Sequence, residues 1–149
     1  TFDCYKQNVK PCFDCKFCCK NNVCINRDLD IFFEKIEKSD LLILASPVYN
    51  MGFPAPLKAV LDRLQVFYNL MLKQPLNKLD AIKKESIIIL TQGSENAEYS
   101  EDLFKHLKII LKPLNFKISH KILLKGTDLK NSNLNDIEDH LSCIKKELT

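Results

Sequence analysis

Glycine is scarce in this chain of 149 residues, which contains only three. An α/β enzyme that binds phosphate through a glycine-rich loop normally needs several glycines, so no such loop is evident. Tryptophan is absent, and only Arg27 and Arg63 are arginines. Arginine is the residue that reads guanine edges and grips phosphates with paired hydrogen bonds. With scattered lysines and a net charge of +3, the sequence predicts no nucleic-acid partner.

Long apolar segments are also missing. No run approaches the ~20 residues that a membrane-spanning helix needs, so we expect no membrane contact. The first ten residues have no apolar signal-peptide core and carry charges at Asp3, Lys6 and Lys10. The composition, 46% hydrophobic and 28% charged, is typical of a globular protein. Because no repeat or linker divides the chain, we expect one domain over residues 1–149.

Cysteine, in contrast, is abundant. The seven cysteines lie at positions 4, 12, 15, 18, 19, 24 and 143. An odd number crowded into the first sixth of the chain makes a poor disulfide framework. The sequence therefore predicts reduced thiols and a cytoplasmic location. Five of these residues fall within positions 10–26, a segment rich in Cys, Lys and Asn that we call the cysteine loop.

The spacing of the cysteine loop is Cys12-x2-Cys15-x2-Cys18-x5-Cys24, and it leaves three interpretations open. Four closely spaced thiolates can wrap a [4Fe–4S] cluster. They can also bind structural zinc, although zinc modules usually separate their two cysteine pairs by a dozen or more residues. Alternatively, the thiols are small packing residues in a loop without a cofactor. Cys19 is either a spare ligand or a simple neighbour of Cys18.

Hydrophobic periodicity predicts alternating helices and strands after the cysteine loop. The helices are expected at 28–38, with Asp28 as N-cap, and at 55–71, 99–112 and 134–148. The strands are expected at 41–45, 86–91 and 116–124. The unbroken apolar run 41–45 is typical of a strand buried on both faces. This order predicts a parallel sheet covered by helices on both faces.

Ligands of parallel sheets bind beyond the carboxyl ends of the strands. In this chain those positions are 46–53 and 91–96, which offer small residues, backbone amides and the side chains of Tyr49, Asn50 and Gln92. The first segment is longer than a usual turn and leaves Tyr49, Met51 and Phe53 available. We therefore expect the binding site at these two loops.

Two stretches of the sequence now indicate a family. One is Lys10-Pro11-Cys12-Phe13-Asp14-Cys15-Lys16-Phe17-Cys18, followed by Cys24 and Arg27-Asp28. The other runs from Ser39 through Ala45-Ser46-Pro47-Val48-Tyr49 to Leu57-Lys58-Ala59 and Leu61-Asp62-Arg63. Thr91-Gln92-Gly93 is a shorter match. On these residues the chain resembles the flavodoxin-like NAD(P)H-dependent FMN reductases, and within them the iron–sulfur flavoproteins.

The resemblance implies FMN and a [4Fe–4S] cluster that exchanges electrons with it. The implied cluster ligands are Cys12, Cys15, Cys18 and Cys24. The implied FMN-binding residues are Ser46, Pro47, Val48, Tyr49, Asn50, Met51, Thr91, Gln92 and Gly93. No nucleophile–base pair or carboxylate dyad stands out, so the flavin is expected to supply the chemistry and no side chain is named catalytic. Homodimers or homotetramers are also implied.

The sequence departs from the family at its beginning. The family opens with a strand, a Ser/Thr-rich phosphate loop and a helix, whereas Thr1–Lys6 looks like the end of the second strand. The missing unit is on the order of 35–40 residues. We therefore expect a flavodoxin-like three-layer sandwich without its first βα unit, in which strand 41–45 is unpaired on one edge.

Three functions remain in competition. The first is an FMN-dependent electron-transfer iron–sulfur flavoprotein. The second is an NAD(P)H-dependent FMN or quinone-type reductase without a cluster. The third is a zinc-stabilised binding module without catalysis. Donor and acceptor are small molecules or proteins in the first two hypotheses.

Overall fold

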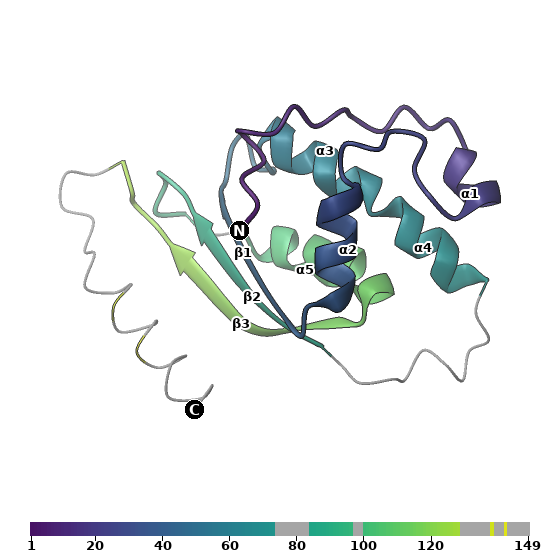
Figure 1. The fold of residues 1–149 in the computed structure, drawn as a ribbon. Helices are drawn as coiled ribbons and strands as arrows, with labels where there is room; N and C mark the ends of the chain where they lie inside the picture. The colour runs from purple at the N-terminus through teal and green to yellow at the C-terminus, as the bar shows by residue number, and fades with distance from the viewer. Residues whose placement is uncertain (74–83, 97–99, 129–137, 139–141, 143–149) are drawn as a thin grey trace.

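The computed structural model describes residues 1–73, 84–96 and 100–128, together with positions 138 and 142. Its elements are α1 (Phe17–Asn21), α2 (Asp30–Lys38), β1 (Leu41–Pro47), α3 (Ala55–Arg63), α4 (Gln65–Leu72), β2 (Lys84–Thr91), α5 (Ser100–Leu111), the 3-10 turn η2 (Lys112–Leu114) and β3 (Phe116–Leu124). Figure 1 shows their arrangement. The helix expected at 134–148 lies outside the described residues except at positions 138 and 142, which are helical.

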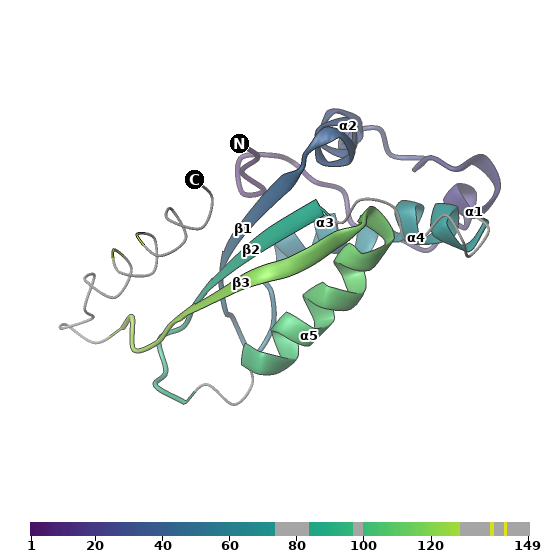
Figure 2. The ribbon, with the colours of Figure 1, turned by 90° about the horizontal axis from the view of Figure 1, so that it is seen from below.

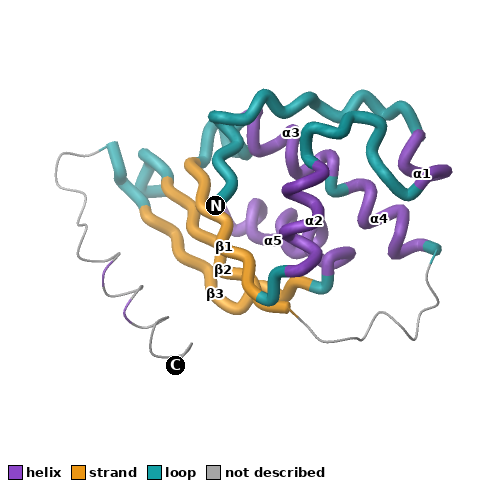
Figure 3. Tube along the Cα trace, viewed as in Figure 1, coloured by secondary structure: helices purple, strands orange, loops and turns teal. Residues whose placement is uncertain are grey.

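The three strands form one parallel sheet in the order β1-β2-β3, as the alternation of elements predicts. The pairing runs from Leu41 opposite Glu85 to Pro47 opposite Thr91 in the first ladder. Within the described part of the chain β1 has β2 as its one partner, so it lies at an edge, as expected for strand 41–45. Figure 3 shows the strands side by side with their carboxyl ends at a common edge.

The main core lies between one face of this sheet and helices α2 to α5. Its fully buried members include Leu29, Ile88, Leu107 and Leu111. Figure 2 shows α5 running beside β3 on that face. Burying a large aliphatic side chain stabilises a fold by ~1.5–3 kcal/mol, so this cluster holds the helices against the sheet.

The opposite face of the sheet holds a smaller cluster, formed by Ile87 and Ile122 with flanking strand side chains. The expectation that strand 41–45 is buried on both faces is wrong. Leu44 packs on the main core, but Ile43, which points the other way, is 58% exposed. The reason is that every described helix of the main core packs on one face, so alternate residues of β1 meet different surroundings.

A β-bulge explains why alternation in β3 is only partial. The register between β2 and β3 shifts between Ser86 and Ile87, which leaves Ser119 without an opposite residue. Phe116, before the bulge, packs in the main core, whereas Ile122, after it, belongs to the cluster on the other face. The Ser119 hydroxyl donates to the Ser86 carbonyl at 3.2 Å. One extra residue has thus exchanged the two faces of the strand.

The continuous helix expected at 55–71 is two helices that meet at Leu64. Pro56 lies in the first turn of α3, as its fixed φ angle predicts. Residues advance by about 100° around a helix, so a straight one would turn Val66 away from the face of Leu64. Both are buried, at 5% and 4% exposure. The break at Leu64 therefore lets both side chains reach the core.

The N-terminal segment differs from its predicted form. Residues 1–6 form no strand; instead the Lys6 amide donates to the Asp3 carbonyl at 3.2 Å, and the Asp3 carboxylate accepts from the Tyr5 amide at 3.0 Å. Phe2 anchors the segment, with its ring centroid 4.5 Å from that of Phe32. A strand needs a hydrogen-bonded partner, and within the described residues none lies beside this segment.

Candidate functional site

Loops that follow the three strands meet at one edge of the sheet. The Val48 amide donates to the Thr91 carbonyl at 2.8 Å and thereby joins the first loop to the second. The second loop is joined to the third, because the Thr127 amide donates to the Gln92 carbonyl at 3.1 Å and the Gly126 amide to the Ser94 carbonyl at 3.3 Å. The structure thus brings together the two loops that the sequence singles out, and adds residues 125–128 beside them.

The loop after β1 presents side chains outward from a tight turn. Tyr49 and Gly52 exchange backbone hydrogen bonds of 3.0 and 2.8 Å, and between them Asn50 and Met51 have φ angles of 49° and 58°. These left-handed conformations hold the Tyr49 and Met51 side chains 56% and 61% exposed. Ser46 is different: it is buried, and its hydroxyl donates to the Pro47 carbonyl at 2.8 Å.

Gln92 has every polar group engaged within the protein. Its side-chain nitrogen donates to the carbonyls of Ser94 and Asn96, both at 2.7 Å, and its side-chain oxygen accepts from the buried Ser100 hydroxyl. The backbone amide donates to the Leu124 carbonyl at 2.9 Å. Gln92 therefore stabilises the conformation of the loop at 92–96.

Gly93 lies against a carboxylate that the sequence did not single out. A Cβ atom at this position would lie 1.9 Å from Oδ2 of Asp128. The absence of a Cβ therefore leaves room for the Asp128 carboxylate, which a larger residue would displace. Asp128 comes from the loop after β3, a position that parallel-strand logic could have added to the candidate list.

Tyr5 is a second residue that sequence reasoning missed. Partial desolvation raises the pKa of its phenol, and the neighbouring Tyr49 phenol raises that pKa further. The N-terminal turn thus lies next to the exposed side chain of the β1 loop. The sequence does not predict this proximity, because Tyr5 and Tyr49 lie in two separate loops that no helix or strand pattern relates.

The cysteine loop contains a short helix, α1, which its lack of periodicity did not predict. The six described cysteines are free thiols; those at 12, 15 and 19 are exposed and those at 4, 18 and 24 half-buried. Asn69 of α4 donates to Cys18 Sγ at 3.1 Å, and Lys73 donates to the Cys19 carbonyl at 2.7 Å. Burial raises the pKa of the Cys18 thiol, against the lowering effect of the Asn69 hydrogen bond.

The four thiols named as metal ligands are not assembled around a common point. Among the described residues no group of three or more His, Cys, Asp or Glu side chains has the arrangement of a metal site. The loop as folded therefore does not fit a preformed cluster or zinc centre. No step of a mechanism is derived through either group.

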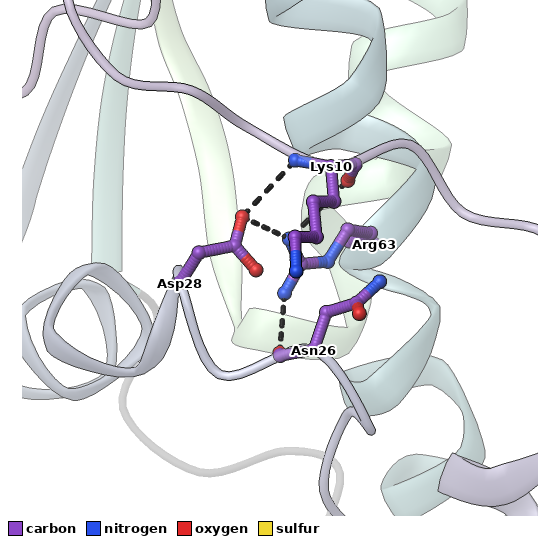
Figure 4. Close-up of polar contacts among 4 residues, drawn as sticks. All are labelled: Lys10, Asn26, Asp28 and Arg63. Atoms are coloured by element: carbon purple, nitrogen blue, oxygen red, sulfur yellow. Dashed lines mark hydrogen bonds and ion pairs between the residues drawn. The ribbon is translucent and has the colours of Figure 1, made fainter.

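Arg63 closes the base of the cysteine loop (Figure 4). Its Nη1 donates to Asp28 Oδ2 at 2.6 Å and to the Lys10 carbonyl at 3.3 Å, while Nη2 donates to the Asn26 carbonyl at 2.6 Å. The Lys10 amide also donates to Asp28 Oδ2, at 3.1 Å. The Arg63 side chain is 1% exposed and that of Asp28 25%. We call these contacts the Arg63 clamp.

The role predicted for Asp28 is wrong, because this residue belongs to the clamp. The sequence predicts this residue as the N-cap of the following helix, but the cap is Leu29 and no side chain caps it. Burial opposes ionisation of Asp28, yet the hydrogen bonds from Arg63 and the Lys10 amide outweigh it and hold the pKa of the carboxyl below its usual range. The carboxylate is thus the counter-ion of a buried guanidinium.

Comparison with known proteins identifies a family and several relatives that this chain resembles. The family described as NADPH-dependent FMN reductase matches residues 1–116. An iron-sulfur flavoprotein of Methanosarcina thermophila is 41% identical over 58 residues, which is 38% of this chain and 30% of that protein. FMN-dependent NADH:quinone oxidoreductase 2 of Idiomarina loihiensis is 25% identical over 136 residues, 80% of this chain and 56% of that protein. The matched part of the chain thus spans about half of these relatives' length or less.

A solved structure supports the fold. The Trp repressor binding protein from Bacillus subtilis superimposes with a TM-score of 0.50 and 22% identity, over 68% of this chain and 64% of that one. The flavodoxin-like α/β fold predicted from the sequence is confirmed by this likeness and by the parallel sheet. Among the described residues no helix is both long and apolar enough to cross a membrane. Because the family match extends over most of the chain, the protein belongs to the NADPH-dependent FMN reductase family.

Proposed function

We propose that the protein is an FMN-dependent oxidoreductase that takes electrons from NAD(P)H or a reduced carrier. The observation that carries this proposal is the pair of loops at Ser46–Met51 and Thr91–Gly93, joined by the Val48–Thr91 hydrogen bond at the carboxyl edge of the sheet. Family membership supports the cofactor. Relatives that bear the name FMN-dependent NADH:quinone oxidoreductase support the reaction class.

The chemistry of the two loops suits a planar flavin ring. Tyr49 and Met51 offer exposed aromatic and thioether surface on one side. Gly93 places no side chain on the second loop, and the bonds made by Gln92 fix the shape of that loop. When bound, FMN supplies the redox step, and these residues bind and orient it. Gln92 is proposed to act through this support, because its own polar groups are already engaged.

A titration with FMN, followed by flavin fluorescence, tests the proposal. Tyr49→Ala should raise the dissociation constant by about tenfold, because loss of aromatic stacking and buried area costs on the order of 1–2 kcal/mol. Tyr68→Ala is the matched control: this tyrosine is 41% exposed but belongs to α4. Absence of FMN binding in the unmodified chain would refute the proposed function. Equal weakening by both variants would refute the assignment of the site.

A cluster on Cys12, Cys15, Cys18 and Cys24 is the second candidate. It is favoured by the spacing and by relatives named iron-sulfur flavoprotein, of which one from Archaeoglobus fulgidus is 36% identical over 58 residues. The separated thiols oppose it. Anaerobic reconstitution with iron and sulfide distinguishes the candidates. A broad visible shoulder beside the flavin bands indicates a cluster, and flavin bands alone indicate a cluster-free reductase. Zinc found by elemental analysis of the purified protein, without flavin bands, indicates the binding module.

Partners and location follow from the same proposal. We expect a small-molecule or protein donor and acceptor, a cytoplasmic location and a homodimer or homotetramer. Of the residues near the end of α4, Phe67 is buried in the core, whereas Tyr68 and Leu72 are 41% and 63% exposed. Leu72, the more exposed of the two, is therefore the side chain at this end of α4 that a subunit contact would use. Light scattering of the purified chain measures the oligomeric state.

A further inference from the structure

We propose that Arg63 is the positioning residue of the cysteine loop: it holds both ends of the loop against α3 and so sets how far Cys24 is exposed. The contacts of the clamp carry this inference independently of the proposed function.

The acceptors of the Arg63 guanidinium come from both ends of the cysteine loop. Arg63 binds Lys10, where the loop begins, and Asn26, where it ends. Asp28 then ties the two ends to each other, because its Oδ2 accepts both from Arg63 and from the Lys10 amide. A guanidinium presents its donors in a fixed fork, so one side chain can bridge these acceptors, whereas the single ammonium of lysine cannot reproduce the arrangement.

Arg63 is also deeply buried. The Arg63 side chain is 1% exposed and lies 6.0 Å from the centre of the Phe33 ring. A buried charge whose partner is removed is strongly destabilising. The only carboxylate paired with this guanidinium in the described part of the chain is that of Asp28. The position of the loop ends therefore affects the stability of the core. If the base of the loop moved away from α3, the buried guanidinium would lose its hydrogen-bond acceptors and its counter-ion.

A second anchor, at the far side of the loop, is independent of the clamp. Asn69, in α4, donates to Cys18. Lys73, the C-cap of α4, donates to the Cys19 carbonyl and to the Asn22 side chain, the latter at 2.5 Å. These contacts hold α1. Cys24 lies between the two anchors, half-buried against the main core, and only two positions before Asn26. Its protection should therefore depend on the clamp, whereas that of Cys18 should depend on α4.

Alkylation of each cysteine by N-ethylmaleimide, resolved by mass spectrometry, tests this division. Arg63→Lys should speed alkylation of Cys24 by at least about tenfold, because hydrogen bonds to charged groups each contribute on the order of a tenfold factor. Cys18 should change less than about twofold. Arg27→Lys is the matched control, since Arg27 pairs with Asp30 at 2.6 Å but is 60% exposed, and it should change neither rate.

Three outcomes decide the positioning role. Faster alkylation confined to Cys24 supports it, and an unchanged Cys24 rate overturns it. If Arg63→Lys speeds Cys4, Cys18 and Cys24 together, the variant has unfolded, and Asp28→Asn is measured in the same way. Selective acceleration of Cys24 in Asp28→Asn supports the proposal. Joint acceleration in this variant as well overturns it.

Discussion

Replacing Gln92 by leucine should destabilise the protein more than its place in a loop suggests. Gln92 is 7% exposed, and its side chain joins three groups: the carbonyls of Ser94 and Asn96 and the hydroxyl of Ser100. Leucine has similar volume and cannot form any of these bonds. The change therefore removes the bonds that shape the loop without opening a large cavity.

The expected loss of unfolding free energy is about 3 kcal/mol. Each hydrogen bond contributes about 1 kcal/mol net, and a buried group left without a partner costs about 1–3 kcal/mol. Ser94 and Asn96 are exposed, so their carbonyls can turn to water and their share is small. Ser100 is 0% exposed, so its hydroxyl cannot replace the lost hydrogen bond with one to water. Most of the loss should therefore come from Ser100.

Urea denaturation measures the effect. With a slope of about 2 kcal/mol per molar, the midpoint should fall by roughly 1.5 M. The double variant Gln92→Leu/Ser100→Ala should recover about 1–2 kcal/mol, because the orphaned hydroxyl is gone. Ser94→Ala is the control, since it keeps the carbonyl that Gln92 binds, and it should cost less than about 1 kcal/mol. A loss below about 0.5 kcal/mol in Gln92→Leu would refute the reasoning.

Two further predictions concern the core and pH. Leu107→Ala should cost about 2–5 kcal/mol in thermal or urea unfolding, because Leu107 is 0% exposed, whereas Ile109→Ala, at 69% exposed, should stay within about 0.5 kcal/mol. Equal losses would contradict the assignment of the inner face of α5. Because the clamp lowers the pKa of Asp28, its contribution to stability is present above the unfolded value of about 4 and is lost as the pH falls through the folded value. The stability gap between the unmodified chain and Asp28→Asn, measured by urea midpoints, should therefore shrink from pH 6 toward pH 3. A gap that does not depend on pH would argue against an ionised Asp28 in the clamp.

Features that depend on neighbouring residues could be predicted from the sequence. The apolar run at 86–91 predicts β2 to within two residues, and the stripe of α5 is predicted to within one. The meeting of loops 46–53 and 91–96 also follows from the sequence, because parallel strands bring their carboxyl ends to one edge.

Features that depend on distant partners could not be predicted. Arg63 at the end of an amphipathic helix looks like a surface charge, and its burial is explained only by acceptors 35 to 53 positions away. Gln92 is a local exception: its side-chain partners Ser94, Asn96 and Ser100 are near in sequence, but the loop that brings them together has no periodic pattern. The bulge at Ser119 is likewise decided by the fit of β3 to β2, not by any turn residue in the strand.

The Arg63 clamp also orders events during synthesis. Lys10 and Arg63 are 53 positions apart. Because ribosomes add roughly 5–20 residues per second, Arg63 is synthesised about 3–10 s after Lys10, and the clamp cannot form before then. Closing it further requires that α3 be folded and packed. For that interval the thiols of the nascent chain, Cys24 included, are open to oxidants and to metal donors, and the finished fold then withdraws Cys24 from them.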